Sequence, residues 1–147
     1  MKIVLLVDGK LSATPEGKLA LDYAQRATAS GRSLGLGPVE IVEIDQAKGK
    51  LEAHLEGARI IACDERGKAW ASRAFAEHIG KLRDGGERKL VFLIGPADGH
   101  DPAIRNRAHE MLAFGPQTWP HALARAMLAE QVYRAVTILG GGPYHRD

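Results

Sequence analysis

The last eight residues bring together side chains that could act on a nucleic-acid base. Three glycines at 140–142 end the last apolar segment, and Pro143, Tyr144, His145 and Arg146 follow. Glycine frees the backbone and proline then stiffens it. The aromatic ring can stack on a base, the imidazole can exchange a proton near neutral pH, and the guanidinium can hold a phosphate or a developing anion. The alternative is a frayed terminus, which is usual for the last few residues of a domain.

A second candidate is the turn at residues 95–99, which follows the apolar run Phe92–Ile94. Open α/β sheets bind ligands at the carboxyl ends of their strands, so this turn is a candidate ligand loop. Its two glycines lack the G-x-G-x-x-G spacing of dinucleotide sites, and Asp98 and Asp101 would repel a phosphate. No G-x-x-x-x-G-K-[ST] sequence is present, which argues against a P-loop.

Metal and nucleophile chemistry are less well supported. None of the six histidines has a paired spacing such as H-x-x-x-H, so no metal site is expected. Cys63 ends an apolar run, where cysteine is more often a small hydrophobic residue than a reactive thiolate. Ser72 is interpreted as a helix N-cap.

The composition fits one globular domain spanning residues 1–147, with 45% hydrophobic and 26% charged residues. A net charge of +2 permits an anionic partner without establishing one. Cys63 is the single cysteine, which excludes an internal disulfide. The opening apolar run Ile3–Val7 is too short for a secretory signal, and no apolar stretch approaches the ~20 residues that span a bilayer. We therefore expect a cytoplasmic protein.

The elements that position these residues alternate between strands and helices. Short apolar runs, typical of strands buried on both faces, occur at Lys2–Val7, Val39–Ile44, Arg59–Cys63 and Lys89–Ile94. Helical spacing occurs at Glu16–Thr28, Lys48–Leu55 and Arg73–Leu82, and Asp101-Pro102 predicts a further helix start with an end near Met111. This alternation indicates an α/β fold with a parallel sheet covered by helices.

The last predicted helix, Pro120–Ile138, is apolar around most of its circumference. Its charged residues form two small patches on opposite sides, His121 with Arg125 and Glu130 with Arg134. A helix of this kind is buried on more than one side. In so small a domain a second chain is a natural cover, so we expect a homodimer built on this helix.

Five short blocks carry a resemblance to a known family: Ala62–Ser72 (ACDERGKAWAS), Phe92–Gly95 (FLIG), Pro120–Arg125 (PHALAR), Glu130–Ala135 (EQVYRA) and Pro143–Arg146 (PYHR). In this order and at this spacing they resemble the bacterial 23S ribosomal RNA pseudouridine N3-methyltransferases. The match is specific from Ile61 onward and looser before it.

The resemblance implies a SPOUT fold with a C-terminal trefoil knot, S-adenosyl-L-methionine as cofactor, an obligate homodimer and 23S ribosomal RNA in the ribosome as substrate. Three loops would hold the cofactor. They fall here at Cys63, at Gly95, and across Phe114, Gly115, Pro116, Gln117, Thr118 and Trp119. Two positions depart from the family: leucine is usual where Cys63 stands, and glycine is usual where Pro96 removes a backbone N–H.

Methylation of N3 requires loss of the imide proton. His145 is the candidate base because its ordinary pKa, about 6.5, lies near working pH. Arg146 would stabilise the imide anion or hold a phosphate, and Tyr144 would stack on the base. Alternatively, water or the acidity of the substrate replaces the base and His145 only orients the nucleotide. A non-catalytic dimeric RNA-binding module that retains the fold is the alternative function.

Overall fold

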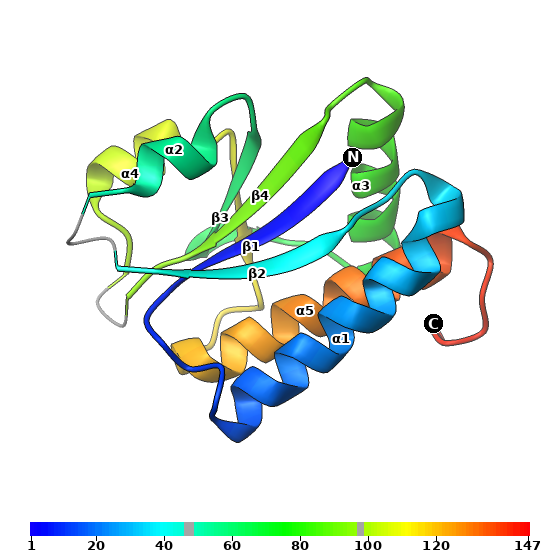
Figure 1. The fold of residues 1–147 in the computed structure, drawn as a ribbon, viewed down its shortest axis with the longest axis horizontal. Coiled ribbons are helices and arrows are strands. Elements are labelled where there is room, and N and C mark those ends of the chain that lie inside the picture. Colours follow the sequence, from blue (N-terminus) through cyan, green and yellow to red (C-terminus); the bar gives the residue numbers. More distant parts are fainter. Residues whose placement is uncertain (46–48, 97–98) are drawn as a thin grey trace.

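The computed structural model describes residues 1–45, 49–96 and 99–147, and within these ranges five parallel strands form one sheet (Figure 1). The strand order is β2-β1-β4-β3-β5. The strands are β1 (Lys2–Asp8), β2 (Val39–Ile44), β3 (Arg59–Ala69), β4 (Lys89–Ile94) and β5 (Glu110–Ala113). The expected parallel α/β sheet is therefore confirmed.

The central strands are apolar on both faces because helices cover both sides of the sheet. Helices α1 (Pro15–Gly31), α3 (Ser72–Asp84) and α5 (His121–Leu139) pack on the face that carries Ile3, Leu5 and Phe92. Helices α2 (Leu51–Leu55) and α4 (Pro102–Arg107) lie on the opposite face, over Val4, Leu6 and Val91 (Figure 1). A strand between two such layers needs apolar side chains in both directions, which explains the continuous runs.

Thr14 and Asp101, two residue types that are favoured at N-caps, cap the N-terminal ends of α1 and α4. The Thr14 side chain accepts a hydrogen bond from the Gly17 N–H, and Pro15 occupies the first turn of α1. The predicted cap Asp101 accepts from the Ala103 N–H at 2.8 Å, which confirms the start of α4. Helix α2 begins at Leu51, whereas the predicted start, Lys48, lies outside the described residues.

The expectation that the fourth helix continues to Met111 is wrong. Helix α4 ends at Arg107, and Glu110–Ala113 forms the edge strand β5 beside β3. His109 fixes this change of direction, because its backbone N–H donates to the Ile60 carbonyl and its Nδ1 accepts from the Ile60 N–H. The pairing with a distant strand outweighs the local helical pattern.

Strand β3 is also longer than predicted. It continues past Cys63 to Ala69, and its pairing with β5 shifts register between Cys63 and Lys68. Gly67 lies against the backbone of β5 so closely that a Cβ there would approach the Met111 carbonyl carbon to 2.5 Å. Only glycine permits this contact.

Helix α5 begins at His121 after Pro120 and is covered by the sheet, α1 and α3 of the same chain. Much of its apolar circumference is thus explained without a second chain. Two sequence interpretations change here. Ser72 is not a cap: Ala71 holds that position, and the Ser72 hydroxyl donates to Gln131 Oε1 at 2.8 Å. Arg125 is not in a surface patch but is 1% exposed.

Candidate active site

Three of the sequence-predicted loops meet at one edge of the sheet. Strands β4, β3 and β5 are neighbours and parallel, so their carboxyl ends lie together. Gly95 follows β4, Cys63 lies opposite Leu112 near the end of β5, and Phe114 follows β5 directly. The structure thus brings together the three segments expected to hold the cofactor, although Ala97 and Asp98 of the Gly95 turn lie outside the described residues.

His100, which sequence reasoning did not select, lies between two of these segments. It is 5% exposed, and its Nε2 lies 3.1 Å from the Cys63 carbonyl oxygen. Its ring packs directly on Gly95, where a Cβ would approach Nδ1 to 2.8 Å. In the sequence His100 stands between a glycine and a helix cap, and no spacing marks it as buried.

Burial dominates the electrostatics of this region. Burial lowers the pKa of His100 despite the opposing Cys63 carbonyl and the Asp64 carboxylate, so its imidazole is neutral at neutral pH. Burial, reinforced by Asp64, raises the pKa of the Cys63 thiol to about 12. Cys63 is therefore a thiol and not a thiolate nucleophile, as its place in the sequence indicates.

The segment 114–119 forms a compact loop beside β3. The Trp119 indole N–H donates to the Phe114 carbonyl at 3.1 Å and closes the loop. The Thr118 hydroxyl donates to the Glu65 carboxylate at 3.3 Å and ties the loop to β3. Pro116 and Gln117 are exposed.

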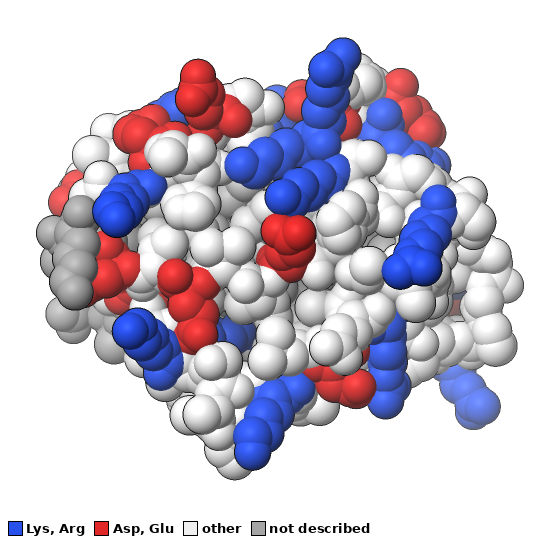
Figure 2. Space-filling view, in the orientation of Figure 1, with Lys and Arg blue, Asp and Glu red and all other residues white. Residues whose placement is uncertain are grey.

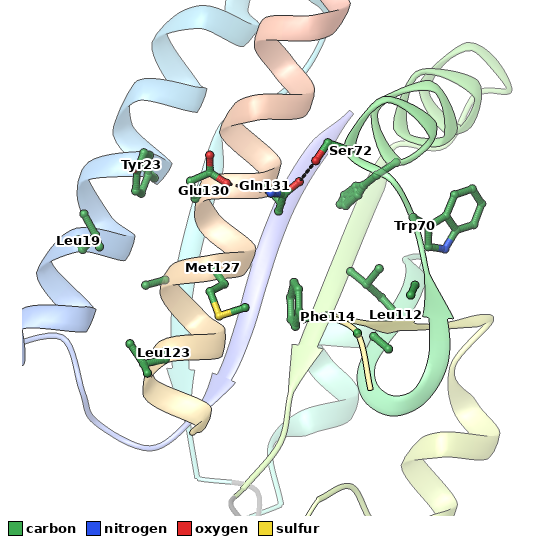
Figure 3. A pocket seen from close by; sticks show the side chains of 15 residues that line it. Leu19, Tyr23, Trp70, Ser72, Leu112, Phe114, Leu123, Met127, Glu130 and Gln131 are labelled. Atoms are coloured by element: carbon green, nitrogen blue, oxygen red, sulfur yellow. Dashed lines mark hydrogen bonds between the residues drawn. The ribbon is translucent and has the colours of Figure 1, made fainter. Parts of the chain in front are cut away.

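An apolar groove of about 470 Å³ opens beside this loop, between α1, α5 and the end of β5 (Figure 3). Its lining includes Leu19 and Tyr23 from α1, Leu123 and Met127 from α5, and Phe114. Leu19 and Leu123, on the side of the groove formed by α1 and α5 (Figure 3), are 48% and 42% exposed, which is unusual for leucine.

The C-terminal tail is docked on α5 rather than frayed. The Tyr144 hydroxyl donates to Glu130 at 3.0 Å, and Arg134 donates both to Glu130 and to His145 Nδ1. Burial, with Tyr23 and Glu130, raises the pKa of Tyr144. Arg146 is exposed.

Within one chain the tail lies away from the Gly95 turn. The C-terminus lies at the opposite end of the molecule from the end of β4, which leads into Gly95 (Figure 1). Tyr144 and His145 thus lie together on α5 and away from Gly95, although Glu130, which accepts from Tyr144, lines the same groove as Phe114. No group of His, Cys, Asp or Glu that could hold a metal ion occurs among residues 1–45, 49–96 and 99–147.

Comparison with known proteins decides the family. A family model described as "Predicted SPOUT methyltransferase" matches residues 1–145. The chain belongs to this family. Two full-length relatives are each named "Ribosomal RNA large subunit methyltransferase H". The protein of Caulobacter sp. (strain K31) is 69% identical, and that of Phenylobacterium zucineum (strain HLK1) is 63% identical, with 100% of both chains covered in each case.

Solved structures show the SPOUT fold with little sequence identity. A probable methylase family protein from Haemophilus influenzae Rd KW20 has a TM-score of 0.55 at 13% identity, covering 95% of this chain and 66% of that one. A probable methyltransferase from Bordetella pertussis Tohama I has a TM-score of 0.53 at 14% identity, covering 92% and 93%. These similarities concern the fold. The trefoil knot, which depends on chain threading and not on strand order, stays a prediction.

Proposed function

We propose that this SPOUT protein transfers a methyl group from S-adenosyl-L-methionine to N3 of a pseudouridine in 23S ribosomal RNA. The full-length similarity to ribosomal RNA large subunit methyltransferases supports the substrate class. The observation that carries the proposal is the convergence of Cys63, Gly95 and the 114–119 loop at the carboxyl edge of three parallel strands.

The residues at this edge fit an adenosine-containing cofactor. Phe114 and Gly115 line the apolar groove of about 470 Å³, whereas the His100 ring fills the space that a side chain of residue 95 would take. When bound there, S-adenosyl-L-methionine supplies an electrophilic methyl group on its sulfonium. Cys63, Gly95, Phe114, Gly115, Pro116, Gln117, Thr118 and Trp119 are the residues that we expect to surround it.

The tail residues supply the remaining chemistry in this proposal. Tyr144 stacks on the base, His145 takes the imide proton of N3, and Arg146 stabilises the resulting anion or a phosphate. In the docked tail the lone pair of His145 Nδ1 faces the Arg134 guanidinium at 3.0 Å. His145 must therefore leave Arg134 before it can accept a proton.

In a homodimer, the tail residues of one chain could lie beside the cofactor loops of the other. The apolar groove beside α1, α5 and the end of β5, with the exposed side chains of Leu19 and Leu123, is a surface that a second copy could cover. One chain's tail would then serve the cofactor loops of its partner.

Charge contributes little to recognition in this proposal. The net charge is only +2, and acidic and basic side chains are interspersed over the face shown in Figure 2. Shape recognition of ribosomal RNA in the assembled ribosome, in the cytoplasm, fits this surface better than non-specific phosphate binding. No helix among the described residues is long and apolar enough to cross a membrane.

The test is incubation of the protein with labelled S-adenosyl-L-methionine and ribosomes from cells that lack the modification. We expect label in 23S ribosomal RNA, and nucleoside mass spectrometry should find it on one pseudouridine. Free 23S RNA and separate subunits are parallel substrates that identify the acceptor. Absence of label from every substrate would contradict the proposal.

The alternative of a non-catalytic RNA-binding module rests on Pro96. Its carbonyl accepts from the Gly99 N–H at 2.8 Å, and its ring nitrogen offers no N–H to a ligand. Calorimetric titration with S-adenosyl-L-methionine separates the two functions, because a module without a working cofactor site gives no binding heat.

A further inference from the structure

His145 has both ring nitrogens engaged in the docked C-terminal tail. Its Nδ1 lies 3.0 Å from the Arg134 guanidinium, which can only donate, so Nδ1 supplies a lone pair and bears no hydrogen. The hydrogen of the ring is then on Nε2, which donates to the Asp147 carboxylate at 2.9 Å. The side chain of His145 is only 10% exposed. A docked His145 therefore has no free lone pair with which to take a proton from a substrate.

The Tyr144 side chain is engaged as well. The Arg134 guanidinium lies over its ring, 4.9 Å from the centroid, and the Tyr133 ring meets it edge to face with the centroids 4.7 Å apart. The Tyr144 hydroxyl donates to Glu130 at 3.0 Å. Arg134 thus covers a ring face on which a base would stack. Of the three tail residues that the proposed function uses, Arg146 is the exposed one.

Two attachments hold the tail on different helices. On α5, Glu130 accepts from both Arg134 and Tyr144. On α3, the Arg73 guanidinium donates to the two carboxylate oxygens of Asp147 at 3.2 Å and 2.7 Å. The second attachment is exposed, and exposed ion pairs contribute little to stability. The tail can therefore be released from α3 at small cost.

We infer that the docked tail is a resting state, which must leave Arg73 and Arg134 before methyl transfer. This inference rests on the proposed function, in which His145 takes the imide proton of N3. The RNA substrate can draw the tail out, because the exposed Arg146 can hold a phosphate and a base can replace Arg134 on the ring of Tyr144. The docked contacts thus keep the proton acceptor unreactive until RNA is bound.

A crosslink in place of the Arg73–Asp147 ion pair tests whether the tail acts while it is docked. In the double variant Arg73→Cys/Asp147→Cys, a short bismaleimide joins the two thiols and keeps the tail on α3. Cys63 does not compete, because burial raises the pKa of its thiol to about 12 and the thiolate is the reactive form. The matched control is the same variant treated with N-ethylmaleimide, which modifies both thiols without joining them. Denaturing electrophoresis separates a crosslink within one chain from one between two chains.

Turnover on ribosomes gives the first result. We expect the crosslinked protein to methylate at least about 100-fold more slowly than the control. Both should bind S-adenosylhomocysteine, the product of methyl transfer, with the same affinity in calorimetry. Equal turnover of the two preparations overturns the inference, because the tail would then act while docked.

The wild-type protein separates the other outcomes. A control as slow as the crosslinked protein, beside an active wild type, also overturns the inference, because Arg73 and Asp147 would then be needed for turnover. If the wild type itself labels no substrate, the proposed function fails and the inference with it.

The position of the hydrogen on the His145 ring tests the docked contacts directly. Imidazole ¹⁵N spectra of the free protein report it, and the spectrum of His145→Gln identifies the signals of this ring among the six histidines. At mildly alkaline pH we expect the hydrogen on Nε2, because Arg134 occupies Nδ1. A hydrogen on Nδ1 would show that Arg134 does not hold this nitrogen, and it overturns the inference.

Discussion

Arg125 joins the first turns of α5 to the end of the sheet. Its guanidinium donates to Glu43 at 2.9 Å and to the Gly9 carbonyl at 3.1 Å, and its side chain is 2% exposed. Glu43 also accepts from the Leu11 N–H. A buried ion pair of this kind contributes little over an apolar pair, but removing one partner leaves the other uncompensated.

We therefore expect Arg125→Met to lower the free energy of unfolding by about 3–5 kcal/mol. Chemical denaturation at neutral pH measures the effect. Arg26→Met is the matched control, because Arg26 pairs with Asp22 on the surface with both side chains about half exposed, and the change should be within about 0.5 kcal/mol. Equal effects of the two substitutions would contradict the structural role of Arg125.

The same pair predicts a pH dependence. Burial raises the pKa of Glu43, but hydrogen bonds from Arg125, Leu11 and Ser12 outweigh it and hold the pKa below its ordinary value. Because the folded pKa is depressed, the stabilisation is present above the unfolded pKa and is lost as pH falls through the folded one. Denaturation of Glu43→Gln should depend less on pH in this acidic range than that of wild type.

The close packing of the His100 ring requires a glycine at residue 95. A Cβ at residue 95 would lie 2.8 Å from Nδ1 and 3.0 Å from Cε1 of the imidazole. We expect Gly95→Ala to displace the ring, to destabilise the fold by about 1–3 kcal/mol and to abolish binding of S-adenosylhomocysteine, as measured by thermal unfolding and calorimetry. The double variant Gly95→Ala/His100→Ala should recover stability but not binding. A Gly95→Ala protein as stable as wild type would show that the ring has room to move.

For single residues, the sequence predicted which positions belong to the candidate site but not which side chains are buried. Gly95 could be placed at a strand end because the apolar run before it is a local pattern, whereas the 114–119 loop came from the family resemblance alone and Cys63 lies inside β3 rather than at its end. His100 and Arg125 could not be recognised as buried, because their partners Cys63 and Glu43 are distant in the sequence.

At the scale of elements, prediction succeeded where a pattern is local and failed where pairing is distant. The bounds of β4 were predicted correctly because the residues after Lys89 form a continuous apolar run. All of these residues are buried in the structure. The extension of β3 to Ala69 and the strand β5 were missed, since each is short or polar and forms only beside the other, with Lys68 opposite Leu112 and Ala69 opposite Ala113.

The tail is the element whose role is most directly testable. We expect deletion of residues 143–147 to leave the cofactor affinity unchanged and to abolish methylation of ribosomes, because the tail is hydrogen-bonded to Glu130, Arg134 and Arg73 and not to the cofactor loops. His145→Ala and Arg146→Ala should each lower turnover roughly 100-fold. Asp147→Ala, which removes the exposed contacts with Arg73 and His145, separates the loss of these contacts from the loss of Tyr144, His145 and Arg146. Wild-type turnover after the deletion would assign the tail a structural role.

At the scale of the whole molecule, our proposal assigns dimer assembly to the apolar groove beside α1, α5 and the end of β5. Met127 lines the groove, whereas its neighbour Leu128 is fully buried in the core of its own chain. The sequence grouped these two residues on one apolar helix. Only the packing of α1 and α3 separates the residue that faces outward from the one that faces inward.

We expect Met127→Lys to give a folded monomer and Leu128→Lys to unfold the chain, because the first charge can reach water and the second cannot. Light scattering at micromolar concentration gives the mass, and circular dichroism gives the folded state. A wild-type protein with the mass of one chain would contradict the dimer.

The position of β4 has a consequence for how the chain folds during synthesis. β4 lies between β1 and β3, although 88 residues precede it. Until it leaves the ribosomal exit tunnel, β1 has a neighbour on one side only and β3 cannot join it, so apolar strand edges stay open to other chains. α5, which covers Ile3 and Phe92, is made later still. The nascent chain therefore leaves apolar strand edges and the α5 side of the sheet uncovered until late in its translation.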